Sequence, residues 1–328
     1  MTMMDERDNF LRILRFEQPE RIISQLPIDS VTYYGMDHQG FENSLGDDSP
    51  IGSRWVDIWG TGWHKLQPGV MGMPEINPLE RPEALKAYQW PDPQDPRLID
   101  PIYSQARAFS GSQRLLACHH RDTLWEKAYM LVGMETMMMA FIDVPDFAHE
   151  VLRHIMDFQI AIARHYLDVG VEMAFLGDDL GSQRGPLLGP RIVNAFLRPE
   201  YQRLFDLYRQ NHVLIGFHSC GNVASVVDMF MELGVNLLNP VQATANDLDW
   251  LRQKTRGRMA LQGGVSSGIL MSGPIKDIQD EARQRLWQLG RNGGYVCQPD
   301  QSLPYPEAHL QALEDTIERF GNYPISLA

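Results

Sequence analysis

Short apolar runs alternate with longer amphipathic stretches through most of this 328-residue chain, and this alternation constrains the fold more than any other feature. Six runs that resemble strands end in polar residues or glycine: RLLACHH (114–120), EMAFLGDD (172–179), VLIGFHSC (213–220), VNLLNPVQ (235–242), RMALQGGV (258–265) and GGYVCQP (293–299). Strands separated by helices pair in parallel, because each helix returns the chain to the same edge of the sheet. With earlier candidates at 26–34 and 55–63, the pattern predicts an α/β fold of the (β/α)8 TIM barrel type.

The same pattern predicts one domain over residues 1–328. Residues 1–110 would form an N-terminal cap and the first strands, and 111–328 the main run of βα units. Residues 64–105 are rich in proline and glycine, which indicates a long ordered excursion at one end of the barrel. No G-x-G-x-x-G turn follows any strand, and its absence argues against an open dinucleotide-binding sheet.

The composition excludes several classes of partner. The formal net charge of -13 disfavours nucleic acid and anionic membranes, which both reward clustered lysine and arginine, so we expect a small-molecule substrate. No apolar run approaches a membrane span, and the opening MTMMDERDNFLRILRF lacks a signal-peptide core. The three cysteines fit reduced thiols better than a disulfide framework. These features predict a cytoplasmic enzyme.

The segment LIGFHSCGNV places His218 and Cys220 two residues apart at the end of an apolar run. On a strand, residues i and i+2 point the same way, so both side chains would project together. Imidazole and thiolate are typical zinc ligands. The alternative is that Cys220 is a small buried apolar residue and His218 a satisfied polar one.

Other strand ends would meet at the same rim of the barrel, where active sites of this fold lie. Asp178 and Asp179 are adjacent, so only one is expected to face the rim, and helix capping is the alternative role. His120 is expected to contact substrate. Asn239 and Gln242 cannot ionise, so we expect them to hydrogen-bond substrate, unless both amides cap loop backbone. From spacing alone, zinc could hold a thiol as thiolate or activate a water molecule.

The order and spacing of several motifs resemble the uroporphyrinogen decarboxylase-like superfamily: FLRILRFEQPERI, WVDIWGTGWHK, LWEKAYMLVGME, GDDLGSQRGPLLGP, HSCGN, GVNLLNPVQ, LQGGV and GGYVCQPDQSLPYP. The opening, GDDLGSQ and HSCG are more similar to its corrinoid-linked methyltransferases, which include methylcobamide:coenzyme M enzymes. This resemblance implies zinc on His218, Cys220 and a distant cysteine, and a corrinoid carried by a partner protein. It also implies methyl transfer between that corrinoid and a small methylated compound or thiol, with Asp178 or Asp179 placing the substrate.

Two rival functions remain open beside methyl transfer. Uroporphyrinogen decarboxylases carry an R-Q-A-G-R-Y stretch near the N-terminus, where this chain reads LPIDSVTYYGMDHQG. Arg121 and Arg184 are the few cations near the strand ends for a tetrapyrrole with many carboxylates. Tyr129, however, matches the decarboxylases' Y-M-x-x-G tyrosine and is a candidate catalytic residue. A non-catalytic ligand-binding barrel is the rival from another class.

The third zinc ligand is a departure from the resemblance. Corrinoid-linked methyltransferases have a cysteine four residues beyond Cys297, where this chain has Gln301. Cys297 is therefore the first candidate for the third ligand, with Asp178 or Glu126 as the alternative. A site that binds metal weakly, or not at all, is a further possibility. Gln301 itself is expected among the substrate-binding residues.

Overall fold

The computed structural model describes residues 4–326, in which seven strands form one parallel sheet. Their order is β1 (Ile28–Val31), β5 (Leu115–His120), β6 (Met173–Gly177), β9 (Leu214–His218), β10 (Leu237–Val241), β11 (Ala260–Val265) and β12 (Tyr295–Pro299). Each of the six apolar runs forms a strand. The predicted α/β class is confirmed.

The sheet has seven strands among the described residues, where the sequence predicts eight. The position beside β12 is taken by the segment before β1, in which Ile23 forms a single parallel bridge to Val296. Cys297 N–H also donates to Ile23 O at 2.9 Å. Polar residues and then Pro27 follow, and the chain bends before it enters β1. A full strand therefore does not form at this edge.

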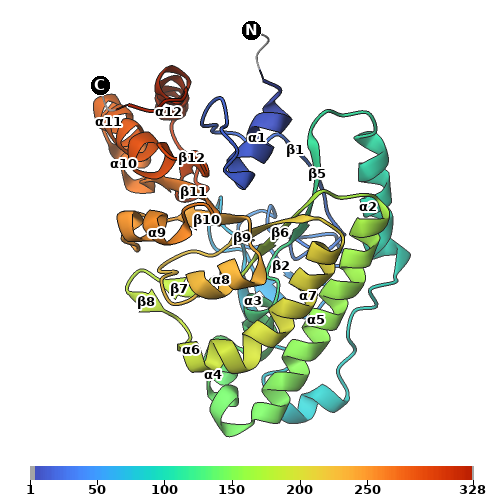
Figure 1. Ribbon diagram of the computed structural model, residues 1–328. Helices are drawn as coiled ribbons and strands as arrows, with labels where there is room; N and C mark the ends of the chain where they lie inside the picture. Colours follow the sequence, from blue (N-terminus) through green and yellow to red (C-terminus); the bar gives the residue numbers. More distant parts are fainter. Residues whose placement is uncertain (1–3, 327–328) are drawn as a thin grey trace.

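The helices that follow the strands cover the outer face of the sheet. After β5 come α3 (Trp125–Val132), α4 (Met134–Asp143) and α5 (Pro145–Asp168). After β6 the chain forms the short pair β7 (Gly181–Ser182) and β8 (Gly185–Pro186), α6 (Pro190–Ile192), a π-helical turn and α7 (Arg198–Gln210). The remaining helices are α8 (Val227–Leu233), α9 (Leu248–Thr255), α10 (Ser267–Ser272), α11 (Ile275–Arg285) and α12 (Glu307–Phe320). The long helices α5 and α7 lie side by side (Figure 1).

Strand alternation divides the side chains between two cores. One face of β5, β6, β10, β11 and β12 gathers in a single cluster with helix α1 (Glu6–Arg15): Phe10, Ile13, Leu14, Leu115, Ala117, Met173, Leu237, Ala260 and Val296. Because strands from opposite ends of the sheet meet in this cluster, the sheet curls around it. We call this side the interior of the sheet. The alternate residues, such as Cys118 and Ile215, pack against the helices.

The N-terminal region differs from a simple cap. Residues 1–110 supply β1 of the main sheet, helix α1 and helix α2 (Pro96–Ala108), which contacts β1. They also form a separate antiparallel sheet of β2 (Arg54–Val56), β3 (Gly62–His64) and β4 (Met73–Ile76). The strand expected at 55–63 is thus two antiparallel strands. Residues 1–3 and 327–328, which the one-domain prediction includes, lie outside the described residues.

A search of residues 4–326 for helices that could cross a membrane finds none of sufficient length and apolar character.

Candidate metal centre

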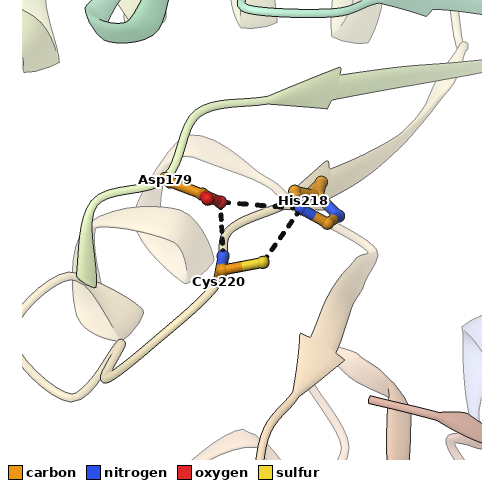
Figure 2. A group of neighbouring side chains, drawn as sticks. All are labelled: Asp179, His218 and Cys220. Atoms are coloured by element: carbon orange, nitrogen blue, oxygen red, sulfur yellow. Dashed lines mark hydrogen bonds and ion pairs between the residues drawn. The ribbon is translucent and has the colours of Figure 1, made fainter. Parts of the chain in front are cut away.

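Asp179, His218 and Cys220 converge where β6 and β9 end (Figure 2). One ligand atom from each side chain lies within 4.8 Å of the others. His218 Nε2 is 3.3 Å from Cys220 Sγ and 3.5 Å from Asp179 Oδ1. The side chains of His218 and Asp179 are 46% and 37% exposed, so an ion and a substrate can reach them. The grouping supplies nitrogen, sulfur and oxygen donors on one side of a small space.

The loop that holds Cys220 depends on glycine. Gly221 has φ +77°, and a Cβ there would lie 2.3 Å from the backbone of Gly181. This close approach lets the chain turn directly after the strand and fold back on β7. In that turn, Cys220 N–H donates to Asp179 Oδ1 at 2.7 Å. The backbone thereby ties the carboxylate to the residue that carries the thiol.

Asn239 fixes the orientation of the His218 ring. Its Oδ1 accepts a hydrogen bond from His218 Nδ1 at 2.8 Å. This contact assigns the Nδ1 proton and turns Nε2 toward Cys220 and Asp179. A metal-binding histidine commonly donates its other ring N–H to a protein oxygen in this way.

The electrostatics of the cluster favour a bound cation. Burial lowers the pKa of His218, but hydrogen bonds with Asp179 and Cys220 outweigh it and raise that pKa well above its usual value. For Asp179 the directions are reversed. Burial raises the pKa of its carboxyl group, but hydrogen bonds from His218 and from Cys220 N–H outweigh this effect and lower that pKa. Both shifts have the same cause, since Asp179 and Cys220 favour positive charge beside His218 Nε2. Three mixed ligands with room for a fourth are typical of catalytic zinc.

The cluster borders a cavity of about 480 Å³, which is lined by residues at the carboxyl ends of β5, β6 and β9 and extends to the start of β1. Its apolar lining includes Leu26, Ile28, Met36, Met71 and Phe175. The polar residues of the lining are His119, His120, Arg121, Asp122, Glu126, Asp179, His218, Asn239 and Gln262. Within residues 4–326, Arg121 is the only lysine or arginine that lines this cavity.

The cation of the cavity is already paired. Arg121 Nη1 lies 2.5 Å from Asp47 Oδ2 and 3.2 Å from Asp37 Oδ1. Asp47 also contacts His38, whose other ring nitrogen lies 2.5 Å from Asp122 Oδ2. Although burial raises the pKa of Asp122, the charge and hydrogen bond of His38 outweigh it and lower that pKa. In this wall of the cavity, Arg121 and His38 are thus held in ion pairs with carboxylates of the protein itself.

Glu126 and Tyr129 stand behind Asp179. Glu126 Oε2 accepts from Asp179 N–H at 3.1 Å, and Glu126 Oε1 accepts from Tyr129 O–H at 3.0 Å. Burial and the nearby charges of Asp122 and Asp179 raise the pKa of Glu126 well above its usual value. Glu126 lines the cavity but lies outside the three-residue cluster. Tyr129 reaches the cluster only through Glu126.

Asp178 is turned away from the cavity, so its assignment as a catalytic residue or metal ligand is wrong. Its carboxylate accepts from Leu124 N–H at 2.9 Å, Glu126 N–H at 2.7 Å and Tyr201 O–H at 2.6 Å. Adjacent residues of an extended chain face opposite sides, so only Asp179 projects to the cluster. Asp178 instead anchors the start of α3, which is the capping alternative.

Cys297 does not join the cluster, and its assignment as the third ligand is wrong. Its neighbour Val296 faces the interior, so Cys297 faces the helices and is fully buried there. Burial raises the pKa of the Cys297 thiol to about 12, which disfavours the thiolate that metal binding requires. Asp179 occupies the place that the sequence interpretation gave to Cys297.

His120 is a second residue on the wrong side of its strand for substrate binding. His120 forms part of the cavity wall, but its ring nitrogens hydrogen-bond Gln159 of α5 at 2.7 Å and Tyr208 of α7 at 2.5 Å. The imidazole is fully buried, and burial lowers its pKa to about 4. The preceding residue, His119, faces the cavity instead.

The two predicted substrate-binding glutamines lie outside the main cavity, one on a loop and one beside the cluster. Gln242 Oε1 accepts from Gly221 N–H at 2.7 Å and from Gln183 Nε2 at 3.0 Å, outside the cavity lining. Gln242 therefore caps the loop that carries Cys220, and its assignment as a substrate ligand is wrong. Gln301 Nε2 donates to Cys220 Sγ at 3.5 Å. Gln301 lies beside the metal centre but outside the lining of the main cavity.

Two contacts at the cavity had no clear sequence signal. Whether Asp179 joins the cluster depends on which of two adjacent carboxylates faces the cavity. The pairing of His38 with Asp122 joins residues 84 positions apart. Only the strand period, applied to Asp178 and Asp179 together, could have found the first.

Comparisons with known proteins give a consistent family. A family model for uroporphyrinogen decarboxylase (URO-D) matches residues 76–320. Uroporphyrinogen decarboxylase of Coxiella burnetii (strain RSA 493 / Nine Mile phase I) is 22% identical over 77% of this chain and 68% of its own length. That of Paraburkholderia xenovorans (strain LB400) is 25% identical over 64% of this chain and 56% of its own. The solved structure of a methyltransferase from Methanosarcina mazei superposes with a TM-score of 0.73 and 16% identity, covering 97% of this chain and 99% of its own.

Proposed function

The chain belongs to the uroporphyrinogen decarboxylase (URO-D) family, and we propose that within this family it is a zinc-dependent methyltransferase. It would move a methyl group between a small methylated compound or thiol and a corrinoid carried by a partner protein. The observation that carries this proposal is the convergence of Asp179, His218 and Cys220 at the cavity. We further propose that residues 1–328 act as one domain.

The donor set fits zinc on its own chemistry. Nitrogen, sulfur and carboxylate oxygen are all zinc ligands, and three of them leave a position for substrate. When bound, zinc would hold a substrate sulfur as thiolate, a stronger nucleophile at neutral pH than the thiol. The thiol proton would pass to solvent, and the thiolate electron pair would form the sulfur–carbon bond. The corrinoid of the partner protein would supply the methyl group and keep the electron pair of the bond that breaks.

The surrounding residues have defined tasks in this reaction. Asn239 keeps Nε2 of His218 directed at the metal position. Glu126 and Cys220 hold Asp179 through backbone contacts, so the carboxylate has one orientation. The apolar lining around Phe175 limits the water that could compete with the methyl group.

Tetrapyrrole decarboxylation is the second candidate, because the curated relatives carry that activity in their names. The charge of the cavity disfavours it. A substrate with many carboxylates needs several convergent cations, whereas Arg121 stands alone in the described lining and is paired with Asp37 and Asp47. A decarboxylation that needs no metal would also make no use of the cluster of Asp179, His218 and Cys220.

The test is methyl transfer by zinc-loaded protein. Incubation with methylcobalamin and a panel of small thiols should remove the methyl–cobalt absorbance, and Cys220→Ser should abolish this loss. Cys118→Ser is the matched control, because Cys118 is a buried thiol outside the cluster. Loss of carboxylate from uroporphyrinogen would support the decarboxylase instead. Absence of activity in both assays would support a non-catalytic ligand-binding barrel.

A further inference from the structure

His119 is a cavity residue to which the chemistry above gives no task. Strand β5 alternates, so Leu115 and Ala117 face the interior cluster while Cys118 packs toward the helices. His119 continues the interior row beyond Ala117 and lines the cavity. It therefore extends from a rigid strand into the space beside the metal centre.

Two independent contacts fix the His119 ring. Nε2 hydrogen-bonds Ser30 Oγ on the adjacent strand at 2.9 Å. The ring also stacks on Phe175 of β6, with centroids 5.2 Å apart and planes 12° from parallel. A ring held from both neighbouring strands presents its other nitrogen, Nδ1, in one direction. This is the preorganisation that a specific binding site requires.

His119 Nδ1 has no hydrogen-bond partner anywhere in residues 4–326, and it is not sealed from solvent. Other polar side chains in the lining are bonded within the protein: Arg121 to Asp37, Asp122 to His38, Glu126 to Tyr129, Asn239 to His218 and Gln262 to Gln298. Gln262 Oε1 also lacks a partner there, but it is sealed from solvent. Nδ1 is therefore an accessible group with unused hydrogen-bonding capacity.

The charge of His119 restricts what it can bind. Burial lowers the pKa of its imidazole, so the ring is neutral at neutral pH. A neutral ring does not attract a carboxylate, and the paired Arg121 leaves little cationic capacity for one. The Ser30 hydroxyl can donate to Nε2 or accept from it, so Nδ1 can serve a ligand as donor or acceptor.

We propose that His119 recognises the substrate through Nδ1, and that this substrate carries an uncharged hydrogen-bonding group such as a hydroxyl or a carbonyl. The apolar body of the substrate lies against Phe175, and its reacting end points to Asp179, His218 and Cys220. The inference rests on the proposed function for the identity of that reacting end. His119 thus sets specificity for neutral small molecules over carboxylates.

The test is calorimetric titration of zinc-loaded protein with three methyl thioethers. These are 2-(methylthio)ethanol, ethyl methyl sulfide and (methylthio)acetate. The unmodified protein should bind the hydroxyl compound about fivefold to tenfold more tightly than ethyl methyl sulfide, the effect of one hydrogen bond to a neutral partner. It should also prefer the hydroxyl compound to (methylthio)acetate, because a neutral ring and a paired Arg121 do not attract a carboxylate.

Two variants separate recognition from structure. His119→Phe keeps the stack on Phe175 but removes Nδ1, so it should bind the hydroxyl compound and ethyl methyl sulfide equally. His119→Asn places an amide near the Nδ1 position and should recover most of the preference. Zinc content should match the unmodified protein in both, because His119 lies outside the metal cluster.

Several results would overturn the inference: no preference in the unmodified protein, no binding of any of the three compounds, a preference that survives His119→Phe, or His119→Asn no better than His119→Phe. Failure of the proposed function is distinguishable, because binding is measured without methyl transfer. Selective binding without transfer from methylcobalamin would leave the assignment of His119 intact. Methyl transfer with unselective binding would do the reverse.

Discussion

Replacing Asn239 with alanine tests whether the His218 ring is positioned for a metal. The substitution removes the 2.8 Å hydrogen bond to Nδ1, which is the contact that directs Nε2 toward Cys220 and Asp179. Loss of such an outer partner typically weakens metal affinity about 10- to 100-fold. That range corresponds to about 1.4–2.7 kcal/mol of binding free energy. We expect this loss in competition titrations of zinc against a chromogenic chelator.

Two further variants make the titration decisive. Asn239→Asp keeps an oxygen acceptor for Nδ1 and should retain zinc at least as tightly as the unmodified protein. Gln262→Ala is the matched control, because Gln262 lines the same cavity but bonds Gln298 and no member of the cluster. Thermal unfolding of each variant would show that the fold persists. Unchanged zinc affinity in a folded Asn239→Ala protein would refute the positioning role.

Three further predictions concern residues that the sequence assigns to the metal or substrate site and that the structure gives other contacts. Cys297→Ser should keep its zinc and lose about 1–3 kcal/mol of unfolding free energy, because a hydroxyl enters an apolar core. Cys220→Ser, in contrast, should lose zinc. Equal zinc loss in the two variants would show that Cys297 is a ligand. Gln242→Ala should lower the unfolding free energy by about 1–3 kcal/mol in urea titrations, because Gly221 N–H loses its acceptor; an unchanged midpoint would contradict this capping role. His120 has a folded pKa of about 4, below its unfolded value, so it destabilises the protein as pH falls below about 6.5. The unfolding free energy of the unmodified protein should therefore fall by about 1.4 kcal/mol more than that of His120→Gln between pH 7.5 and 5.5, and parallel curves would refute the assignment.

Sequence reasoning located the strands because a buried parallel sheet requires apolar runs at regular intervals. It also located two members of the candidate metal cluster, since His218 and Cys220 share one face of the chain at the end of one strand. The eighth strand was a wrong prediction. Counting apolar runs does not show that Ile23 forms only one bridge before Pro27 interrupts the pairing.

Which side chains of a strand face the interior was harder to predict than the position of the strand in the sequence. A shift of one residue exchanges the interior for the helix-facing side. Sequence reasoning therefore assigns His120 to the substrate site and Cys297 to the metal site. In the structure, their neighbours His119 and Val296 are the residues that face the interior. Gln242 was misassigned for another reason. The loop it caps comes from a different strand, so its partner Gly221 is invisible to any local pattern.

Zinc X-ray absorption of the purified protein tests the central claim most directly. The account predicts one zinc per chain with a single sulfur ligand at about 2.3 Å and nitrogen or oxygen ligands at about 2.0–2.2 Å, matching Cys220, His218 and Asp179. Asp179→Ala should lower the zinc affinity without changing the sulfur shell. A shell of two sulfurs, or negligible zinc after metal-replete growth, would contradict the account.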